Sequence, residues 1–207
     1  HAQEEANDQA FAKELASLGD LYVNDAFGSA HRAHASTEGI TKFIAPSVAG
    51  YLMEKELAFL GKALGEPARP YVAIIGGAKV SDKILIIENL LEKATDIIIG
   101  GGMAYTFMKA EGGQIGNSLC EADRLDVALD IIKKAAAKGV NLHLPSDSII
   151  ADKFDAQANV STAPSNAIPE GWMGLDIGPK ACERFTHVIH HSRTILWNGP
   201  MGVFEME

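Results

Sequence analysis

The sequence has 207 residues, of which 47% are hydrophobic and 22% charged, and its formal net charge is −9. This composition is typical of a soluble globular chain that folds without disulfides, its apolar runs are too short to span a membrane, and its negative charge disfavours nucleic acid and anionic membranes as partners. Cys120 and Cys182 show no metal-type spacing, which predicts two free thiols and a reducing, cytoplasmic compartment.

The first quarter of the chain is predicted to hold a helix over 7–18, a strand over 21–23, and a loop with short helical turns over 28–46. Asn7 or Asp8 is available as the cap of that helix, and its apolar residues at helical spacing are Phe11, Leu15 and Leu18. The clearest helix follows over 49–64 and ends at Gly65. Its apolar stripe consists of Met53, Leu57, Leu60 and Leu64.

After Pro70 a pattern of strand, turn and helix repeats. Continuous apolar strands are predicted over 71–75, 96–99, 140–144, 148–151 and 194–197. Helices are predicted from Gly77 through Lys93, from Met103, from a Ser118–Glu121 capping box to Gly139, and from Pro179, with mostly loop over 152–170. Because apolar strands alternate with amphipathic helices, we predict an α/β fold with a doubly wound, Rossmann-like parallel sheet covered on both faces.

In doubly wound sheets, ligands bind beyond the carboxyl ends of the strands. This rule selects Asn24-Asp25, Gly76-Gly77, Gly100–Gly102 and Asn198–Pro200. The first glycine loop is followed by Lys79 and Lys83, which are four apart and are predicted to share one face at a helix N-terminus, a favourable site for a polyanion. The alternative is a solvated basic helix face, and the segment has no Walker A pattern.

Two further segments carry groups suited to anions or nucleotides. Arg32 lies between His31 and His34 in a loop after a strand, where a guanidinium fork suits a carboxylate or phosphate, although an ordinary surface Arg is the alternative. Asn198 can bond a phosphate, and Glu205 can accept the hydroxyls of a ribose or be a plain surface residue. We predict no metal ligand in this chain, and the histidines that we expect to be structural or exposed are His143, His187, His190 and His191.

Four segments together resemble the phosphoglycerate kinase family, in the same order and at fitting separations. Their sequences resemble bacterial or plastid members more than animal ones. They are residues 24–34, 76–83, 171–179 and 197–205. The resemblance implies a monomeric enzyme of two doubly wound domains that transfers a phosphoryl group between 1,3-bisphosphoglycerate and ADP, giving 3-phosphoglycerate and ATP, with Mg²⁺ accompanying the nucleotide. It implies that Arg32, His31 and His34 hold the triose, and that Lys79 and Arg32 are catalytic. The nucleotide contacts that it implies are Lys79, Lys83, Gly77, Gly101, Gly102, Leu119, Asn198 and Glu205.

The resemblance also implies a domain organisation. Residues 1–46 would end the triose-binding domain, 47–65 would form the interdomain helix, and 66–207 would form an incomplete nucleotide-binding domain. Several family motifs are absent, including the opening Asp-x-Asn-x-Pro segment and the Gly-Gly-Gly-Asp-Ser/Thr loop that holds the metal-nucleotide. We therefore expect an internal fragment that is inactive by itself.

Two other functions remain open from the sequence. A dinucleotide-dependent oxidoreductase would suit strand–glycine–helix units, but it requires Gly-x-Gly-x-x-Gly, which Ile75–Lys79 does not provide. A non-catalytic binding domain of kinase ancestry is the third reading. Binding of ADP and ATP, but not of NAD, separates the kinase from the oxidoreductase.

Overall fold

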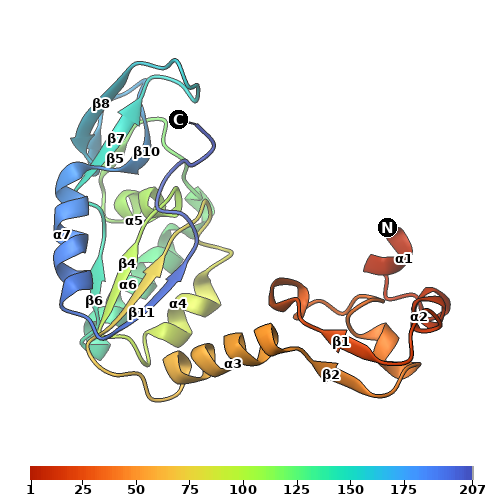
Figure 1. The fold of residues 1–207 in the computed structure, drawn as a ribbon. Helices are drawn as coiled ribbons and strands as arrows, with labels where there is room; N and C mark the ends of the chain where they lie inside the picture. The colour runs from red at the N-terminus through yellow and green to blue at the C-terminus, as the bar shows by residue number, and fades with distance from the viewer. Residues whose placement is uncertain (207) are drawn as a thin grey trace. The chain divides into compact units, whose positions relative to one another are not determined.

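A computed structural model describes residues 1–206, and the chain divides into two compact units, His1–Gly65 and Glu66–Glu207 (Figure 1). Among the described residues, every helix is too short or too polar to cross a bilayer. The first unit contains one pair of parallel strands and three α-helices. In chain order these are α1 (Ala2–Glu5), α2 (Gln9–Ala16), β1 (Tyr22–Asn24), β2 (Ser47–Ala49) and α3 (Tyr51–Leu64).

The helix predicted over 7–18 is shorter than expected and buries different residues. Asp8 caps α2, since its Oδ1 accepts a hydrogen bond of 2.8 Å from the Phe11 amide. The buried side chains are Ala12 and Ala16, whereas Leu18 is 83% exposed, because the helix ends before it. Small residues therefore form the contact face of α2.

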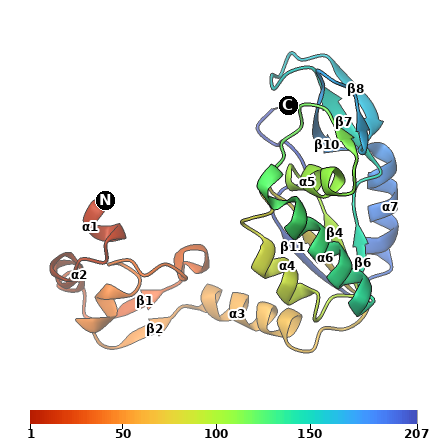
Figure 2. The same ribbon diagram turned by 180° about the vertical axis from the view of Figure 1, so that it is seen from behind.

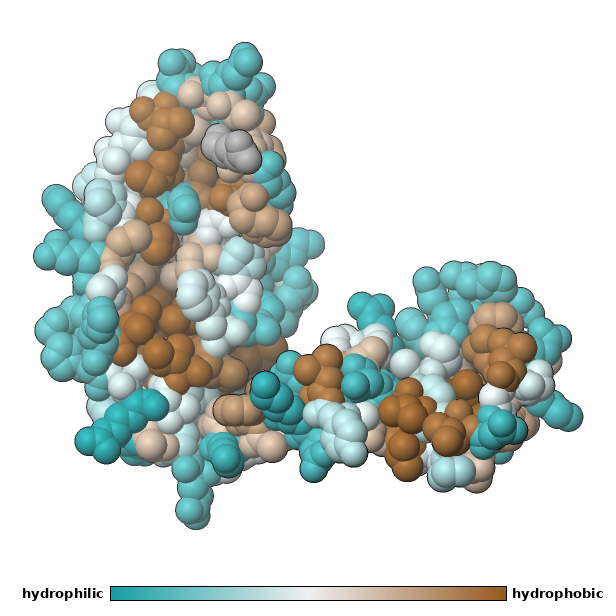
Figure 3. All heavy atoms as spheres, viewed as in Figure 1, coloured by the Kyte–Doolittle hydropathy of each residue, from teal (hydrophilic) through white to brown (hydrophobic). Residues whose placement is uncertain are grey.

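The N-terminus of α3 is capped from a distant loop. The Asp25 carboxylate accepts a hydrogen bond of 2.8 Å from the Met53 amide, which satisfies one free N–H of the first turn. Met53 is the one buried residue of α3, while Leu57 and Leu64 of the predicted stripe are about half exposed. Hydrophobic surface is visible on this unit in Figure 3.

The second unit is built on a four-stranded parallel sheet in the order β11-β3-β4-β6. Its strands are β3 (Tyr71–Ile75), β4 (Asp96–Ile99), β6 (Asn141–His143) and β11 (Thr194–Asn198). From β3 the chain proceeds outward to β4 and β6, and it returns to the other side of β3 as β11. The strand order thus reverses between β3 and β11, which is where ligands bind in open α/β sheets.

Helices cover both faces of this sheet, which confirms the predicted fold class (Figures 1 and 2). One face packs against α4 (Ile84–Leu90), α5 (Met103–Ala110) and α6 (Leu125–Lys138). The other face packs against α7 (Pro179–His190), whose Ala181 and Phe185 contact Val72, Ile74 and Ile98. Every residue of β3 is buried, because the strand is central and covered twice.

The segment between β6 and α7 departs from the prediction. β7 (Asp147–Ala151) does not join the parallel sheet but lies in a separate antiparallel sheet, in the order β10-β7-β8. Residues 152–170, predicted as mostly loop, contain β8 (Val160–Pro164) and β9 (Ala167–Ile168), and β9 pairs with β5 (Gln114–Ile115). The third strand of the antiparallel sheet is β10 (Met173–Ile177).

Two predicted helix starts are wrong. The helix after Gly77 begins only at Ile84, so Lys79 and Lys83 lie in an irregular loop and at its N-cap rather than on one helical face. The Ser118–Glu121 capping box does not form, because both side chains bond to other loops and α6 begins after Arg124. Gly139 ends α6 in the left-handed conformation, as predicted (φ 69°).

Candidate functional site

Three loops meet at the carboxyl ends of β3, β4 and β11 through backbone hydrogen bonds. The Gly76 amide donates to the Asn198 carbonyl at 2.9 Å, the Gly101 amide to the Met201 carbonyl at 2.7 Å, and the Met103 amide to the Gly77 carbonyl at 3.0 Å. The glycine-rich sequences predicted to lie at one edge of the sheet are thus joined there directly. The fourth place selected from the sequence, Asn24-Asp25, belongs to the first unit.

The loops approach so closely that two positions exclude side chains. A Cβ at Gly76 would overlap the Pro200 carbonyl oxygen, which is rigid backbone. Gly101 has φ +69°, and a Cβ there would lie 2.5 Å from the Gly77 carbonyl oxygen. Both glycines are required by the contact between loops, so the edge is preformed by the backbone itself.

A cavity of about 420 Å³ opens against these loops. Five of the predicted nucleotide contacts line it: Gly77, Gly101, Gly102, Leu119 and Glu205. The remaining wall includes Phe154, Met173, Leu175, Val203 and Phe204, so its side chains are largely apolar. A flat glycine wall facing apolar side chains, with one carboxylate at the margin, suits a planar aromatic base joined to a polyhydroxyl group.

Lys83 and Asn198 lie beside this cavity and contact each other. The Lys83 Nζ donates a hydrogen bond of 2.5 Å to the Asn198 Oδ1, although the two residues are 115 positions apart. Lys83 also passes close to Gly77, whose ideal Cβ would lie 3.6 Å from the Lys83 Cε. Lys79, Lys83 and Asn198 are not among the residues that line the cavity, and Lys79 and Asn198 are exposed.

The sequence predicted Glu121 as part of a helix capping box, but in the structure it binds another loop. Its carboxylate accepts hydrogen bonds from the Ser81 amide at 3.0 Å and the Ser81 hydroxyl at 2.6 Å. Burial opposes its ionisation, but the Ser81 bonds, the Val80 amide and the Lys79 charge outweigh burial and lower the pKa of Glu121. Glu121 therefore anchors the loop that carries both lysines, and no local sequence signal marks this tertiary contact.

The Arg32 loop belongs to the first unit and is described by itself. Arg32 and His31 are exposed, and the loop is shaped by a hydrogen bond of 2.5 Å from the Thr37 hydroxyl to the Arg32 carbonyl. The His34 ring is partly buried, with its Nδ1 3.8 Å from the Glu4 carboxylate. Glu4 also accepts hydrogen bonds from the amide and hydroxyl of Ser36. This geometry favours His34 as a residue that positions the loop, while Arg32 and His31 are accessible to a ligand.

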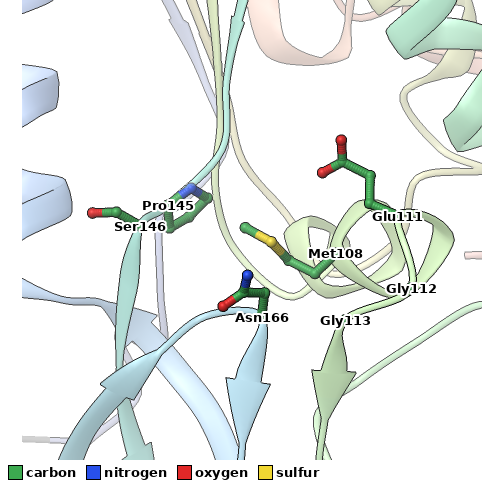
Figure 4. A pocket seen from close by; sticks show the side chains of 7 residues that line it. All are labelled: Met108, Glu111, Gly112, Gly113, Pro145, Ser146 and Asn166. Carbon is green, nitrogen blue, oxygen red and sulfur yellow. The ribbon is translucent and has the colours of Figure 1, made fainter.

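A second hollow of about 470 Å³ lies at the C-terminal end of α5 and contains none of the predicted site residues (Figure 4). It is lined by Met108, Glu111, Gly112, Gly113, Pro145, Ser146 and Asn166. In Figure 4 the Glu111 carboxylate and the Ser146 hydroxyl point away from each other, so the polar groups do not converge. This hollow provides a reference surface for tests of the first cavity.

Comparisons with known proteins identify the family of this chain. The family model "Phosphoglycerate kinase" matches residues 1–207. The chain is 63% identical to the phosphoglycerate kinase of Acidobacterium capsulatum over 207 residues, covering 100% of this chain and 51% of that protein. It is 60% identical to a chloroplastic phosphoglycerate kinase of Volvox carteri over 205 residues, covering 99% of this chain and 44% of that protein.

A solved structure of phosphoglycerate kinase from Coxiella burnetii superposes with a TM-score of 0.83 at 43% identity, covering 99% of this chain and 53% of that one. The chain therefore spans about half the length of the relatives that it matches. Because the family model covers the whole sequence, the chain belongs to the phosphoglycerate kinase family.

Proposed function

We propose that this chain supplies the nucleotide pocket and part of the triose site of a phosphoglycerate kinase. In that reaction the acyl phosphate of 1,3-bisphosphoglycerate loses its phosphoryl group to the terminal phosphate oxygen of ADP, which leaves 3-phosphoglycerate and ATP. The observation that carries the proposal is the cavity at the reversal of strand order, where Gly77, Gly101, Gly102, Leu119 and Glu205 converge.

The cavity suggests how ADP or ATP would lie. The base would stack between the glycine wall and Leu119, and the ribose hydroxyls would donate to Glu205. The phosphates would then extend toward Lys83 and Asn198, which already contact each other beside Gly77. Binding would replace the Lys83–Asn198 hydrogen bond with contacts to phosphate oxygens, and these charge-assisted bonds are stronger.

Lys79 and Lys83 would act mainly by neutralising charge. Phosphoryl transfer spreads negative charge over the equatorial oxygens, and fixed cations stabilise that charge in the transition state. Through Ser81, Glu121 would hold the loop that carries both ammonium groups. In the first unit, Arg32 would bind the carboxylate or phosphate of the triose with its planar fork, aided by His31 and positioned by His34.

Magnesium would enter with the nucleotide. Among residues 1–206, no group of three or more His, Cys, Asp or Glu side chains is placed to hold a metal ion. The ion would be bound largely by phosphate oxygens and by groups outside the described residues.

The compartment and assembly state are also proposals. Relatives named cytosolic, from Nicotiana tabacum, and chloroplastic, from Volvox carteri, both match the chain. We propose a cytoplasmic monomer that acts on small molecules and binds neither nucleic acid nor membranes, in keeping with the net charge of −9.

Calorimetric titration of the full-length protein with ADP, ATP and NAD tests the proposed pocket. We expect ADP and ATP to bind and NAD not to bind. Leu119→Ala should weaken ADP binding about tenfold, because it removes apolar surface from the base. Asn166→Ala, in the reference hollow, should leave ADP affinity unchanged. Equal effects of the two variants, or binding of NAD in place of ADP, would refute the assignment.

A further inference from the structure

The C-terminal end of α7 presents two imidazole rings side by side. His187 and His191 are four residues apart, so they share one face of the helix. Their ring centroids lie 4.2 Å apart with an angle of 42° between the planes, and both residues are exposed. Histidines four residues apart on one helix face can both ligate one metal ion, at the usual nitrogen–metal distance of about 2.0–2.1 Å.

The hydrogen bonding of His191 fixes which of its nitrogens is available. Its Nδ1 lies 2.7 Å from the backbone carbonyl oxygen of His187. A carbonyl can only accept, so Nδ1 carries the proton and the neutral ring keeps its lone pair on Nε2. Metal-binding histidines are commonly oriented in this way, by donating their second ring N–H to a backbone carbonyl.

The helix dipole also favours a cation at this position. α7 ends at His190 with His191 as its C-cap, so the pair lies at the negative end of the helix dipole. Neutral imidazole suits Zn²⁺, Ni²⁺ and Cu²⁺, whereas Mg²⁺ and Ca²⁺ prefer oxygen ligands. Residues 1–206 contain no cluster of three or more candidate ligands, so a site here would have two protein ligands and open positions for water.

We propose that His187 and His191 together bind one transition-metal ion, Zn²⁺, Ni²⁺ or Cu²⁺, through Nε2 of His191 and a ring nitrogen of His187. Water molecules complete the coordination, so the ion exchanges readily. Cu²⁺ binds more tightly than Zn²⁺ or Ni²⁺. This site is independent of the proposed kinase activity and lies on a helix that does not line the nucleotide cavity.

Zn²⁺ titration calorimetry on the full-length protein provides the test, with His187→Ala, His191→Ala and His190→Ala as matched variants. Removing either member of the pair should weaken Zn²⁺ binding at this site by at least about tenfold, and the double variant should lose little more. His190→Ala removes a histidine from the same helix end and should leave the affinity unchanged. Circular dichroism confirms that each variant is folded.

Cu²⁺ electron paramagnetic resonance gives a second readout that a structural defect would not mimic. The wild-type spectrum should show two imidazole nitrogens, and each single variant of the pair should show one. The proposal is overturned if His187→Ala and His191→Ala bind Zn²⁺ as the wild type does. It is equally overturned if His190→Ala weakens binding as much as they do.

Discussion

The two loops predicted to contact anions, residues 76–83 and 24–34, are supported in different ways. The first follows the fully buried strand β3 and is tied by Gly76 to the neighbouring strand β11 and by Ser81 to Glu121. The second follows β1, a strand without a buried residue in a two-stranded sheet, and its hydrogen bonds are mostly local in sequence.

This difference shows that the conformation of a loop is fixed only where the sheet that carries it is itself stable. A two-stranded sheet is marginally stable in water, whereas four covered strands form a core of their own. The second unit thus contains the scaffold for its candidate pocket. The first unit leaves large apolar residues exposed, among them Leu18, Tyr51 and Leu52.

The largest expected effect is the absence of turnover by the 207-residue chain alone. With ATP and 3-phosphoglycerate it should show no rate above background, because transfer requires both substrates to be held in line. The exposed apolar surface of the first unit should also make it poorly soluble, as measured by sedimentation. A phosphoglycerate kinase chain of the relatives' full length should turn over under the same conditions. Clear turnover by the 207-residue chain alone would show that it holds both substrates in line without further segments.

Lys79→Ala in the full-length protein should lower kcat by about 10²–10³, as expected for loss of a donor that faces the developing charge. Lys83→Ala should weaken nucleotide binding as well, because Lys83 lies beside the cavity and contacts Asn198. Lys133→Ala, on the exposed surface of α6, is the control and should change neither quantity. Near-normal turnover in both site variants would identify a solvated basic loop.

Arg32→Lys should affect only the triose side of the reaction. Lys keeps the charge but loses the bidentate fork, so the apparent KM for 3-phosphoglycerate should rise or kcat should fall, with ADP affinity unchanged. Steady-state kinetics with each substrate varied in turn separates these outcomes. Unaltered kinetics would remove Arg32 from the site.

Glu121→Gln should destabilise the 76–83 loop by about 1 kcal/mol at pH 7, through weakened bonds to Ser81. Because the pKa of Glu121 is lowered in the folded state, its contribution is present above the usual Glu range near 4.3. The contribution declines as the pH falls below that range and is lost below the folded-state pKa. The rate of hydrogen exchange at the Ser81 amide should therefore be higher in Glu121→Gln than in the wild type at pH 7. In acid the two rates should become equal. A pH-independent difference would exclude the ionised anchor.

The smallest effect is expected at Tyr71, whose buried hydroxyl has no hydrogen-bond partner among the described residues. Tyr71→Phe removes an unsatisfied polar group. The free energy of unfolding, measured by thermal denaturation, should stay unchanged or rise by up to about 1 kcal/mol. Tyr105→Phe is the matched control, because the Tyr105 hydroxyl donates to Ser148 at 3.0 Å and its loss should be destabilising. Equal destabilisation by both would point to a bridging water at Tyr71.

The sequence pattern predicted those elements whose ends are set by neighbouring residues such as Gly and Pro. β3 and β4 have the predicted bounds, because continuous apolar runs end at glycines, and Pro179 begins α7 as expected. The start of α4 could not be predicted, since the preceding loop is held by Glu121, 40 positions from Ser81. β8 was missed because only Ala163 of its five residues is buried, so it lacks an apolar run.

The candidate site was predicted to a similar extent and for a similar reason. The strand-end rule brought Gly77, Gly101 and Asn198 to one edge of the sheet, where the structure joins their loops. The capping-box pattern misled, because Ser118 accepts from the Gly174 amide and Glu121 binds Ser81 instead. When a side chain has both a suitable local partner and a suitable tertiary partner, its spacing in the sequence does not show which of the two it binds.

The central position of β3 has a consequence for the time course of folding during translation. One edge of β3 pairs with β4 soon after synthesis, but the other waits for β11, and Ile75 pairs with Asn198 about 120 residues later. At about 5–20 residues per second the ribosome needs roughly 6–24 s to supply that partner. Throughout that interval a wholly apolar strand keeps an unpaired edge, which leaves the nascent chain open to pairing with strands of other chains.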